Sequence, residues 1–207
     1  MEACVSVVDD DTLVLRSLGR LLRSAGFAVR TFPTAQEFLA DEQGAAGCVV
    51  IDLSLPGLGG LELQRALARS RDPRPIVFIS GCGDIASSVA AMKAGAVDFL
   101  VKPFDAQTLL AAVRRAVDRA RISRVVREEL SAISKRVAAL TPREREVLAR
   151  VVDGKLNKQI AAELGTAEKT VKVHRARMMR KMGVDSLAGL VRAWTAIRHT
   201  DTAAAAL

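Results

Sequence analysis

The 207-residue sequence contains few aromatic side chains and few cysteines. Six Phe, one Trp and no Tyr argue against a stacking platform for single-stranded nucleic acid. The three cysteines, Cys4, Cys48 and Cys82, form no CxxC pair, so we expect reduced thiols and no zinc site. No stretch without charge exceeds nine residues, and the amino terminus lacks a basic patch followed by a long apolar run. We therefore expect a cytoplasmic protein with no membrane-spanning helix and no secretory signal.

The net charge of +8 is unevenly distributed along the chain. Residues 1–104 carry 10 basic and 12 acidic side chains, whereas residues 138–200 carry 13 basic and 6 acidic ones. A small basic domain is most often a domain that binds nucleic acid. The charge distribution therefore predicts two domains with different functions.

Residues 1–104 alternate short apolar runs with amphipathic stretches, which predict strands and helices respectively. The predicted strands cover residues 4–8, 28–32, 48–52, 75–79 and 98–101. The predicted helices cover residues 13–25, 34–40, 60–69, 85–94 and a segment that starts after Pro103. Asp11 and Asp105 are the expected N-caps of the first and last helices. Because the strands are apolar on both faces, we predict an α/β fold, a doubly wound, flavodoxin-like, five-stranded parallel sheet.

Polar side chains follow the predicted strands at their carboxyl ends. They are Asp9, Asp10, Asp11, Asp52, Ser80 and Lys102. Ligands of open parallel sheets bind beyond these strand ends. Clustered carboxylates suit Mg²⁺, and a carboxylate can accept a phosphoryl group whose oxygens a metal ion, a lysine and a hydroxyl then stabilise. Singly, such residues are more often turn residues or helix caps, but their joint occurrence at successive strand ends favours a site.

Four segments of the first half carry a family resemblance. VVDDD, VVIDLSLPGLGG, VFISGCGD and FLVKPF resemble, in this order, the receiver domain of two-component response regulators, which we place at residues 1–120. The resemblance implies that Asp52 is phosphorylated. It implies that Asp9 and Asp10 are the acidic pair at a Mg²⁺ ion. The backbone carbonyl of Ser54 would complete the protein's share of the metal shell.

The resemblance also assigns roles to the later strand ends. Ser80 would be the switch hydroxyl, and Lys102 would contact the phosphoryl group before a cis bond to Pro103. Phe99 would be the switch aromatic. Segment 53–55 lacks the Arg-Met often found there, and Cys82 occupies a position that tunes access for dephosphorylation. Both departures concern the lifetime of the phosphoryl group rather than the mechanism.

The segment that joins the halves has no helix-breaking residue. Neither Gly nor Pro occurs from Asp105 to Leu140, so one long helix can run through it, with residues 121–137 as a helical linker. Its second part carries an apolar seam at Val126, Leu130, Ile133, Val137 and Leu140. Two heptads of this spacing fit either a coiled coil that dimerises or bridges the domains, or a helix that folds back on its own domain.

The second half has the pattern of a small all-α domain with four helices. We expect these helices over residues 142–153, 156–164 and 166–182, and from Ser186 onward. Thr141, Pro142 and Glu144 form a capping box with proline at the first helical position. Thr166 can cap the third helix. The short connection at Gly165 predicts a helix-turn-helix.

The third of these helices has two different faces. Val171, Met178 and Met182 fall on one side and should pack inward, with Arg175 at the edge of that side. The opposite side carries cations beside small apolar residues, namely Lys169, Lys172, Val173, Ala176 and Arg180. Such a surface suits the major groove of DNA.

This half resembles the LuxR-type helix-turn-helix through LTPREREVL, NKQIAAELG and EKTVKVHRARMMRKMGV. We place that domain at residues 138–200, followed by a disordered tail at 201–207. The resemblance implies base-edge contacts by Lys172, Val173 and Ala176. The residues it places near phosphates are Lys169, Thr170, His174, Arg177 and Arg180, together with Asn157 and Lys158 on the preceding helix.

Together, the two halves resemble the FixJ/LuxR-type response regulators. The resemblance implies a two-component transcriptional regulator that is not an enzyme. A histidine kinase would phosphorylate Asp52 with Mg²⁺, controlling homodimerisation, domain arrangement and sequence-specific binding to double-stranded DNA, with RNA polymerase as a further partner. Two alternatives stay open. One is a phosphatase that uses Asp52, although residues 1–104 contain no His. The other is an adaptor whose basic domain binds an acidic protein.

Overall fold

The computed structural model describes residues 3–41, 47–70, 72–81 and 85–205. The chain divides into two compact units, Met1–Arg124 (unit one) and Val125–Leu207 (unit two). Cys82, singled out in the sequence, lies outside the described residues. Among the helices that the structure describes, none is long and apolar enough to cross a membrane.

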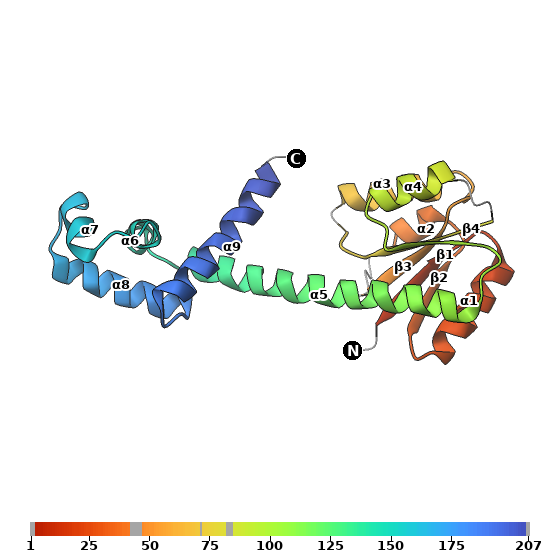
Figure 1. Ribbon diagram of the computed structural model, residues 1–207, viewed down its shortest axis with the longest axis horizontal. Helices are drawn as coiled ribbons and strands as arrows, with labels where there is room; N and C mark the ends of the chain where they lie inside the picture. Colours follow the sequence, from red (N-terminus) through yellow and green to blue (C-terminus); the bar gives the residue numbers. More distant parts are fainter. Residues whose placement is uncertain (1–2, 42–46, 71, 82–84, 206–207) are drawn as a thin grey trace. The chain divides into compact units, whose positions relative to one another are not determined.

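Unit one is built on a five-stranded parallel sheet (Figure 1). Its strands are β1 (Cys4–Val8), β2 (Ala28–Phe32), β3 (Gly47–Asp52), β4 (Ile76–Ser80) and β5 (Asp98–Val101). The spatial order is β2-β1-β3-β4-β5, and every pairing is parallel. The predicted fold class is confirmed, and each predicted strand lies within one residue of the observed one. The strand order reverses direction between β1 and β3, and in open α/β sheets ligands bind at the carboxyl ends of the strands beside such a point.

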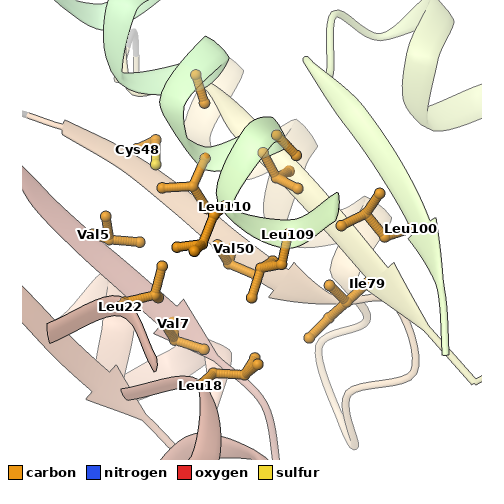
Figure 2. Packing of buried hydrophobic residues seen from close by; sticks show 14 of the residues in the cluster. Val5, Val7, Leu18, Leu22, Cys48, Val50, Ile79, Leu100, Leu109 and Leu110 are labelled. Atoms are coloured by element: carbon orange, nitrogen blue, oxygen red, sulfur yellow. The ribbon is translucent and has the colours of Figure 1, made fainter. Parts of the chain in front are cut away.

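Helices cover both faces of this sheet (Figure 1). They are α1 (Thr12–Ser24), α2 (Ala35–Leu39), α3 (Gly60–Arg69), α4 (Ile85–Lys93) and the first part of α5 (Ala106–Ala138). Because successive strand side chains point to opposite faces, each strand supplies two cores. Figure 2 shows the core beneath α1 and α5, which contains Val5, Val7, Leu18, Leu22, Cys48, Val50, Ile79, Leu100, Leu109 and Leu110. The core beneath α2, α3 and α4 contains the alternate strand residues, among them Val8, Val49, Ile51 and Phe78.

The predicted N-caps of unit one are confirmed. Asp11 Oδ1 accepts hydrogen bonds from the backbone N–H of Leu13 at 2.7 Å and of Val14 at 3.4 Å. Asp105 Oδ1 accepts from the backbone N–H of Thr108 at 2.7 Å. Each cap accepts hydrogen bonds from amide groups that have no partner within the first turn of the helix. Helices α1 and α5 therefore begin directly after Asp11 and Asp105.

Unit two combines the last turns of α5 with four further described helices. These are α6 (Pro142–Val152), α7 (Asn157–Glu163), α8 (Glu168–Met182) and α9 (Leu187–Ala205). They enclose one core that includes Leu140, Val147, Leu148, Ile160, Val171, Met178, Met182 and Leu190. The predicted capping box is confirmed, since Thr141 and Glu144 bond to each other's backbone N–H. Helix α9 extends through residues 201–205, which we predicted to be part of a disordered tail.

The prediction that Thr166 caps the third helix is wrong. Helix α8 begins at Glu168, and its N-cap is Ala167, which makes no side-chain capping bond. Thr166 instead closes the preceding helix, because its backbone N–H donates to the Ala161 carbonyl at 3.0 Å beyond a left-handed Gly165. This Schellman closure of α7 uses the residue that the sequence pattern had given to α8.

The apolar seam of α5 has two parts. Leu140 is buried, and Ile133 and Val137 pack against the core of unit two. Val126 is 48% exposed, and Leu130 is half-buried. The later part of the seam therefore contributes to the core of unit two, whereas the earlier part is left partly exposed.

Candidate functional site

The carboxyl ends of β1 and β3 bring three aspartates together. Val8, the last residue of β1, pairs with Ile51, so Asp9 and Asp52 follow on neighbouring strands. One carboxylate oxygen from each of Asp9, Asp10 and Asp52 lies within 4.8 Å of the other two. Asp9 and Asp52 are buried, and Asp10 is exposed. The structure thus places at one edge of the sheet the three carboxylates that the sequence put in one site.

Lys102, which follows β5, reaches the same cluster. Its Nζ lies 2.9 Å from Asp9 Oδ2 and 3.3 Å from Asp52 Oδ1. Its backbone N–H donates to the Ser80 carbonyl at 2.7 Å, which fixes it against β4. Burial alone would lower the pKa of Lys102, but the hydrogen bond to Asp9 and the negative charge of Asp52 raise it above its usual value. Lys102 therefore stays a cation in the site. The bond to Pro103 is cis, as the resemblance implied.

Asp52 is buried without full compensation of its charge. It is 5% exposed, and its Oδ1 accepts no hydrogen bond of good geometry from any described residue. Burial raises the pKa of Asp52, the charge of Lys102 lowers it, and the charge of Asp9 raises it again, so that the pKa lies above its ordinary value. A buried carboxylate oxygen that faces two further carboxylates is a hard-ligand set suited to a divalent cation.

Gly60, which we did not predict to have a role, allows helix α3 to begin close to the end of β3. A Cβ on Gly60 would lie 2.5 Å from the Asp52 carbonyl oxygen and 3.0 Å from Leu53 Cα. The Gly60 N–H donates to the Leu53 carbonyl at 3.1 Å. Helix α3 can therefore begin this close to Asp52 only because residue 60 has no side chain. The adjacent glycines Gly59 and Gly60 were the feature of the sequence that could have predicted this close approach.

The two predicted switch residues lie on β4 and β5. Ser80 ends β4, is fully buried, and follows Ile79, the pairing partner of Asp52. Phe99 pairs with Phe78, and their ring centroids are 6.3 Å apart. Phe99 is half-buried against the core beneath α2, α3 and α4. Ser80 therefore lies on the strand beside Asp52, and Phe99 lies on the next strand, β5, which is in contact with α4.

The second candidate site is the exposed side of α8. Val171, Met178 and Met182 are buried, as the sequence predicted. Of the residues assigned to DNA on this helix, the exposed ones are Lys169, Thr170, Lys172, Val173, Ala176, Arg177 and Arg180, and His174 is half-buried. Lys172 pairs with Glu168 at 2.9 Å. Because both side chains of this pair are exposed, it contributes little stability, and Lys172 can exchange this partner for another.

The two residues assigned on α7 differ in their surroundings. Lys158 is exposed. Asn157 is half-buried, and its Oδ1 accepts a hydrogen bond from Arg175 Nη1 at 3.1 Å. Arg175 lies at the edge of the buried side of α8, as predicted. Its bond to Asn157 was not predicted, and it links the two helices of the helix-turn-helix.

Two family models match the chain, one over each half. The response regulator receiver domain matches residues 5–114, and the luxR family of bacterial regulatory proteins matches residues 138–194. Response regulator protein TmoT of Ectopseudomonas mendocina is 45% identical over 92% of this chain and 87% of its own length. This chain belongs to the response regulators.

The similarity of this response regulator to its relatives extends over nearly the whole chain. Transcriptional regulatory protein FixJ of Bradyrhizobium diazoefficiens is 43% identical over 91% of this chain and 92% of its own length. The solved structure of the response regulator StyR is 46% identical, with a TM-score of 0.84 over 94% of this chain and 99% of that one. The receiver and LuxR-type domains identify a two-component transcriptional regulator, as the sequence predicted.

Unit two of this response regulator contains a buried ion pair that we did not predict from the sequence. Glu144 is 2% exposed, and its Oε2 accepts hydrogen bonds from the Thr141 N–H at 2.9 Å and from Lys181 Nζ at 2.7 Å. The hydrogen bond from Lys181 lowers the pKa of Glu144 most, and the one from Thr141 adds to it. The capping box predicted the bond to Thr141, but no pattern linked α6 to a lysine 37 residues away.

Proposed function

We propose that a histidine kinase phosphorylates this response regulator on Asp52 in a Mg²⁺-dependent reaction, and that phosphorylation controls its dimerisation and its binding to DNA. The observation that carries the proposal is the buried Asp52 Oδ1, which lacks a hydrogen bond from the described residues and lies beside two carboxylates and Lys102. An oxygen in this state is available both to a metal ion and to an incoming phosphorus atom.

In this proposal, Asp9, Asp10 and the backbone carbonyl of Ser54 hold the metal ion with Asp52. When bound, Mg²⁺ supplies positive charge to the carboxylate and phosphoryl oxygens. A carboxylate oxygen of Asp52 attacks the phosphorus of the kinase's phosphohistidine, so that a P–O bond forms as the P–N bond breaks and the imidazole stays with the kinase. Lys102 then contacts one phosphoryl oxygen, and the Ser80 hydroxyl donates to another.

The surface that would respond to this change lies on α4 and β5. Ile85, Val89 and Met92 recur on one side of α4 and are 78%, 44% and 45% exposed, and Val101 on β5 is 46% exposed. Apolar side chains grouped in this way favour a partner surface. We propose that Ser80 and Phe99, which lie on β4 and β5, reshape this surface when Asp52 is phosphorylated, and that two copies then pair through it as a symmetric dimer.

Labelling with a small acyl phosphate tests the phosphorylation step. With acetyl phosphate and Mg²⁺, intact mass should rise by one phosphoryl group in the wild type and in Asp118→Asn, which alters an exposed aspartate of α5. Asp52→Asn should take up none. Val89→Asp should still be labelled but should stay monomeric by sedimentation, whereas the labelled wild type dimerises. Equal labelling of Asp52→Asn would refute the assignment of the acceptor.

For DNA, we propose that α8 enters the major groove and that Lys172, Val173 and Ala176 face base edges. Lys169, Arg177 and Arg180 on the same helix would contact phosphates, together with His174, Thr170 and the two α7 residues. Recruitment of RNA polymerase at the bound site belongs to the same proposal. Phosphate contacts give affinity that falls with salt for every sequence, whereas base contacts select among sequences.

Two alanine variants separate these roles, once a binding duplex has been selected from genomic fragments with the phosphorylated protein. Lys172→Ala should lose discrimination between the selected duplex and a random one, by about tenfold. Arg180→Ala should weaken binding to both duplexes alike and reduce the slope of affinity against salt by about one. Equal behaviour of the two variants would contradict the assignment.

A further inference from the structure

The last turn of α5 and the carboxyl end of α8 cap each other. Arg136 Nη1, on α5, donates to the Met182 carbonyl at the end of α8, at 3.1 Å. In return, Lys181 Nζ on α8 donates to the Ala139 carbonyl just beyond α5, at 3.2 Å. We call Arg136, Lys181 and Glu144 the α5–α8 clamp, because Lys181 also pairs with the buried Glu144 of α6 at 2.7 Å.

The two bonds of the clamp to backbone carbonyls satisfy groups that have no partner within the helix. The last carbonyls of an α-helix have no partner within the helix, and a cation at that end also interacts favourably with the helix dipole. Gly183 follows Met182 in the left-handed conformation, and a Cβ there would lie 3.1 Å from Arg136 Nη1. The guanidinium therefore fits closely around the end of α8.

Apolar packing supports the same arrangement. Ile133 and Val137 of α5 pack against the core of unit two, in which Met178 and Met182 of α8 are buried. Residues 125–137 nevertheless precede residue 138, where the match to the luxR family begins. The unit that contains the recognition helix thus includes a segment of α5 outside the family domain.

We propose that Arg136 is a positioning residue for DNA recognition: it holds the carboxyl end of α8 so that the base-facing side chains of this helix enter the groove at one fixed angle. This inference deepens the proposed DNA binding and rests on it. Arg136 acts through Met182 and Gly183 rather than through phosphate. Loss of its bond should therefore impair the reading of sequence, which needs a fixed helix, more than electrostatic attachment, which does not.

The test uses the full-length phosphorylated protein, a selected duplex and a random duplex of equal length. Arg136→Met removes the donor but keeps a long side chain, and Lys135→Met removes the same charge at the adjacent exposed position. Arg136→Met should bind the selected duplex about tenfold more weakly, with the random-duplex affinity and the salt slope equal to those of Lys135→Met. Arg136→Lys, which keeps a cation able to reach a carbonyl, should recover most of the loss.

Each other outcome overturns the proposal. An equal loss on both duplexes together with a smaller salt slope would mean that Arg136 contacts phosphate. An unchanged affinity for the selected duplex, or an equal loss in Lys135→Met, would mean that the clamp does not set the reading angle. A thermal unfolding curve of unit two, followed by Trp194 fluorescence, checks that each variant is folded at the assay temperature. If the wild type itself prefers no duplex, the proposed DNA recognition fails, which is a separate result.

Discussion

Asp52 in unit one and Glu144 in unit two are both buried carboxylates, and each pairs with a lysine. Their pKa values nevertheless move in opposite directions. Burial raises the pKa of Asp52 despite the nearby charge of Lys102. The hydrogen bond from Lys181 lowers the pKa of Glu144, and burial only partly offsets it.

The difference lies in which influence is largest: burial dominates the pKa of Asp52, whereas the hydrogen bond from Lys181 dominates the pKa of Glu144. Glu144 Oε2 also accepts from the backbone N–H of Thr141, so its charge is held by two donors. Burial and the like charge of Asp9 raise the pKa of Asp52 and outweigh Lys102 and the backbone of Ser54, which lower it. Asp52 Oδ1 accepts no hydrogen bond of good geometry from the described residues. A carboxylate with its donors in place stabilises the fold. One held beside like charge raises the energy of the fold until further positive charge, such as a divalent cation, is bound.

The largest effect should follow from removing the satisfied carboxylate. Glu144→Ala takes away an ion pair and half of a capping box, and it leaves the Thr141 N–H without its partner. We expect the free energy of unfolding of unit two to fall by about 2 kcal/mol. Urea unfolding followed by the fluorescence of Trp194, the single tryptophan, which packs on this core, measures it.

Glu146→Ala is the matched control for this variant. Glu146 lies on the same helix and pairs with Arg143 at 2.7 Å, but its side chain is 46% exposed. Removing it should cost less than about 0.5 kcal/mol. If the two substitutions had equal effects, burial would not distinguish Glu144, and the comparison with Asp52 would lose its basis.

The position of Asp52 in the site and the capping role of Glu144 could both be predicted from the sequence. Asp52 could be predicted because parallel strands end at one edge, so that residues far apart along the chain meet once the apolar runs are assigned. The capping role of Glu144 could be predicted because its partner Thr141 is three residues away. In both cases a short local pattern is enough for the prediction, because the parallel sheet or the helix turn brings the partners together.

Contacts with no repeating pattern could not be predicted in this way. Lys181 reaches Glu144, and Arg136 reaches Met182, only because of the angles at which helices pack, and such angles leave no period in the sequence. Thr166 was misassigned for another reason. Two local motifs, an N-cap for α8 and a Schellman closure for α7, competed for one residue, and the left-handed Gly165 before it favoured the closure.

A smaller effect, of opposite sign, should follow from removing the unsatisfied carboxylate. Without divalent ions, Asp52→Asn should stabilise unit one by about 1 kcal/mol, because it removes a buried charge beside Asp9. Mg²⁺ at ten times its dissociation constant should stabilise the wild type by about 1.4 kcal/mol and the variant much less. Calorimetric unfolding with and without Mg²⁺ measures both. Destabilisation by Asp52→Asn without Mg²⁺ would mean that Lys102 already compensates the charge.

The smallest effect should be the pH dependence of two stability differences, wild type minus Asp52→Asn and wild type minus Glu144→Ala. It should have opposite signs in the two units. The folded pKa of Asp52 is raised, so folded unit one binds a proton more readily than the unfolded chain does, and its unfolding free energy relative to Asp52→Asn should increase as the pH falls through that pKa. The folded pKa of Glu144 is lowered, so its contribution is complete above the unfolded pKa and disappears as the pH falls through the folded one. Unfolding measured without Mg²⁺ from pH 7 to about pH 3, as wild type minus variant for each site, should give curves of opposite slope. Parallel curves would show that the aspartate cluster is compensated in the same way as the α5–α8 clamp, and Asp52 would then not be poised for a cation.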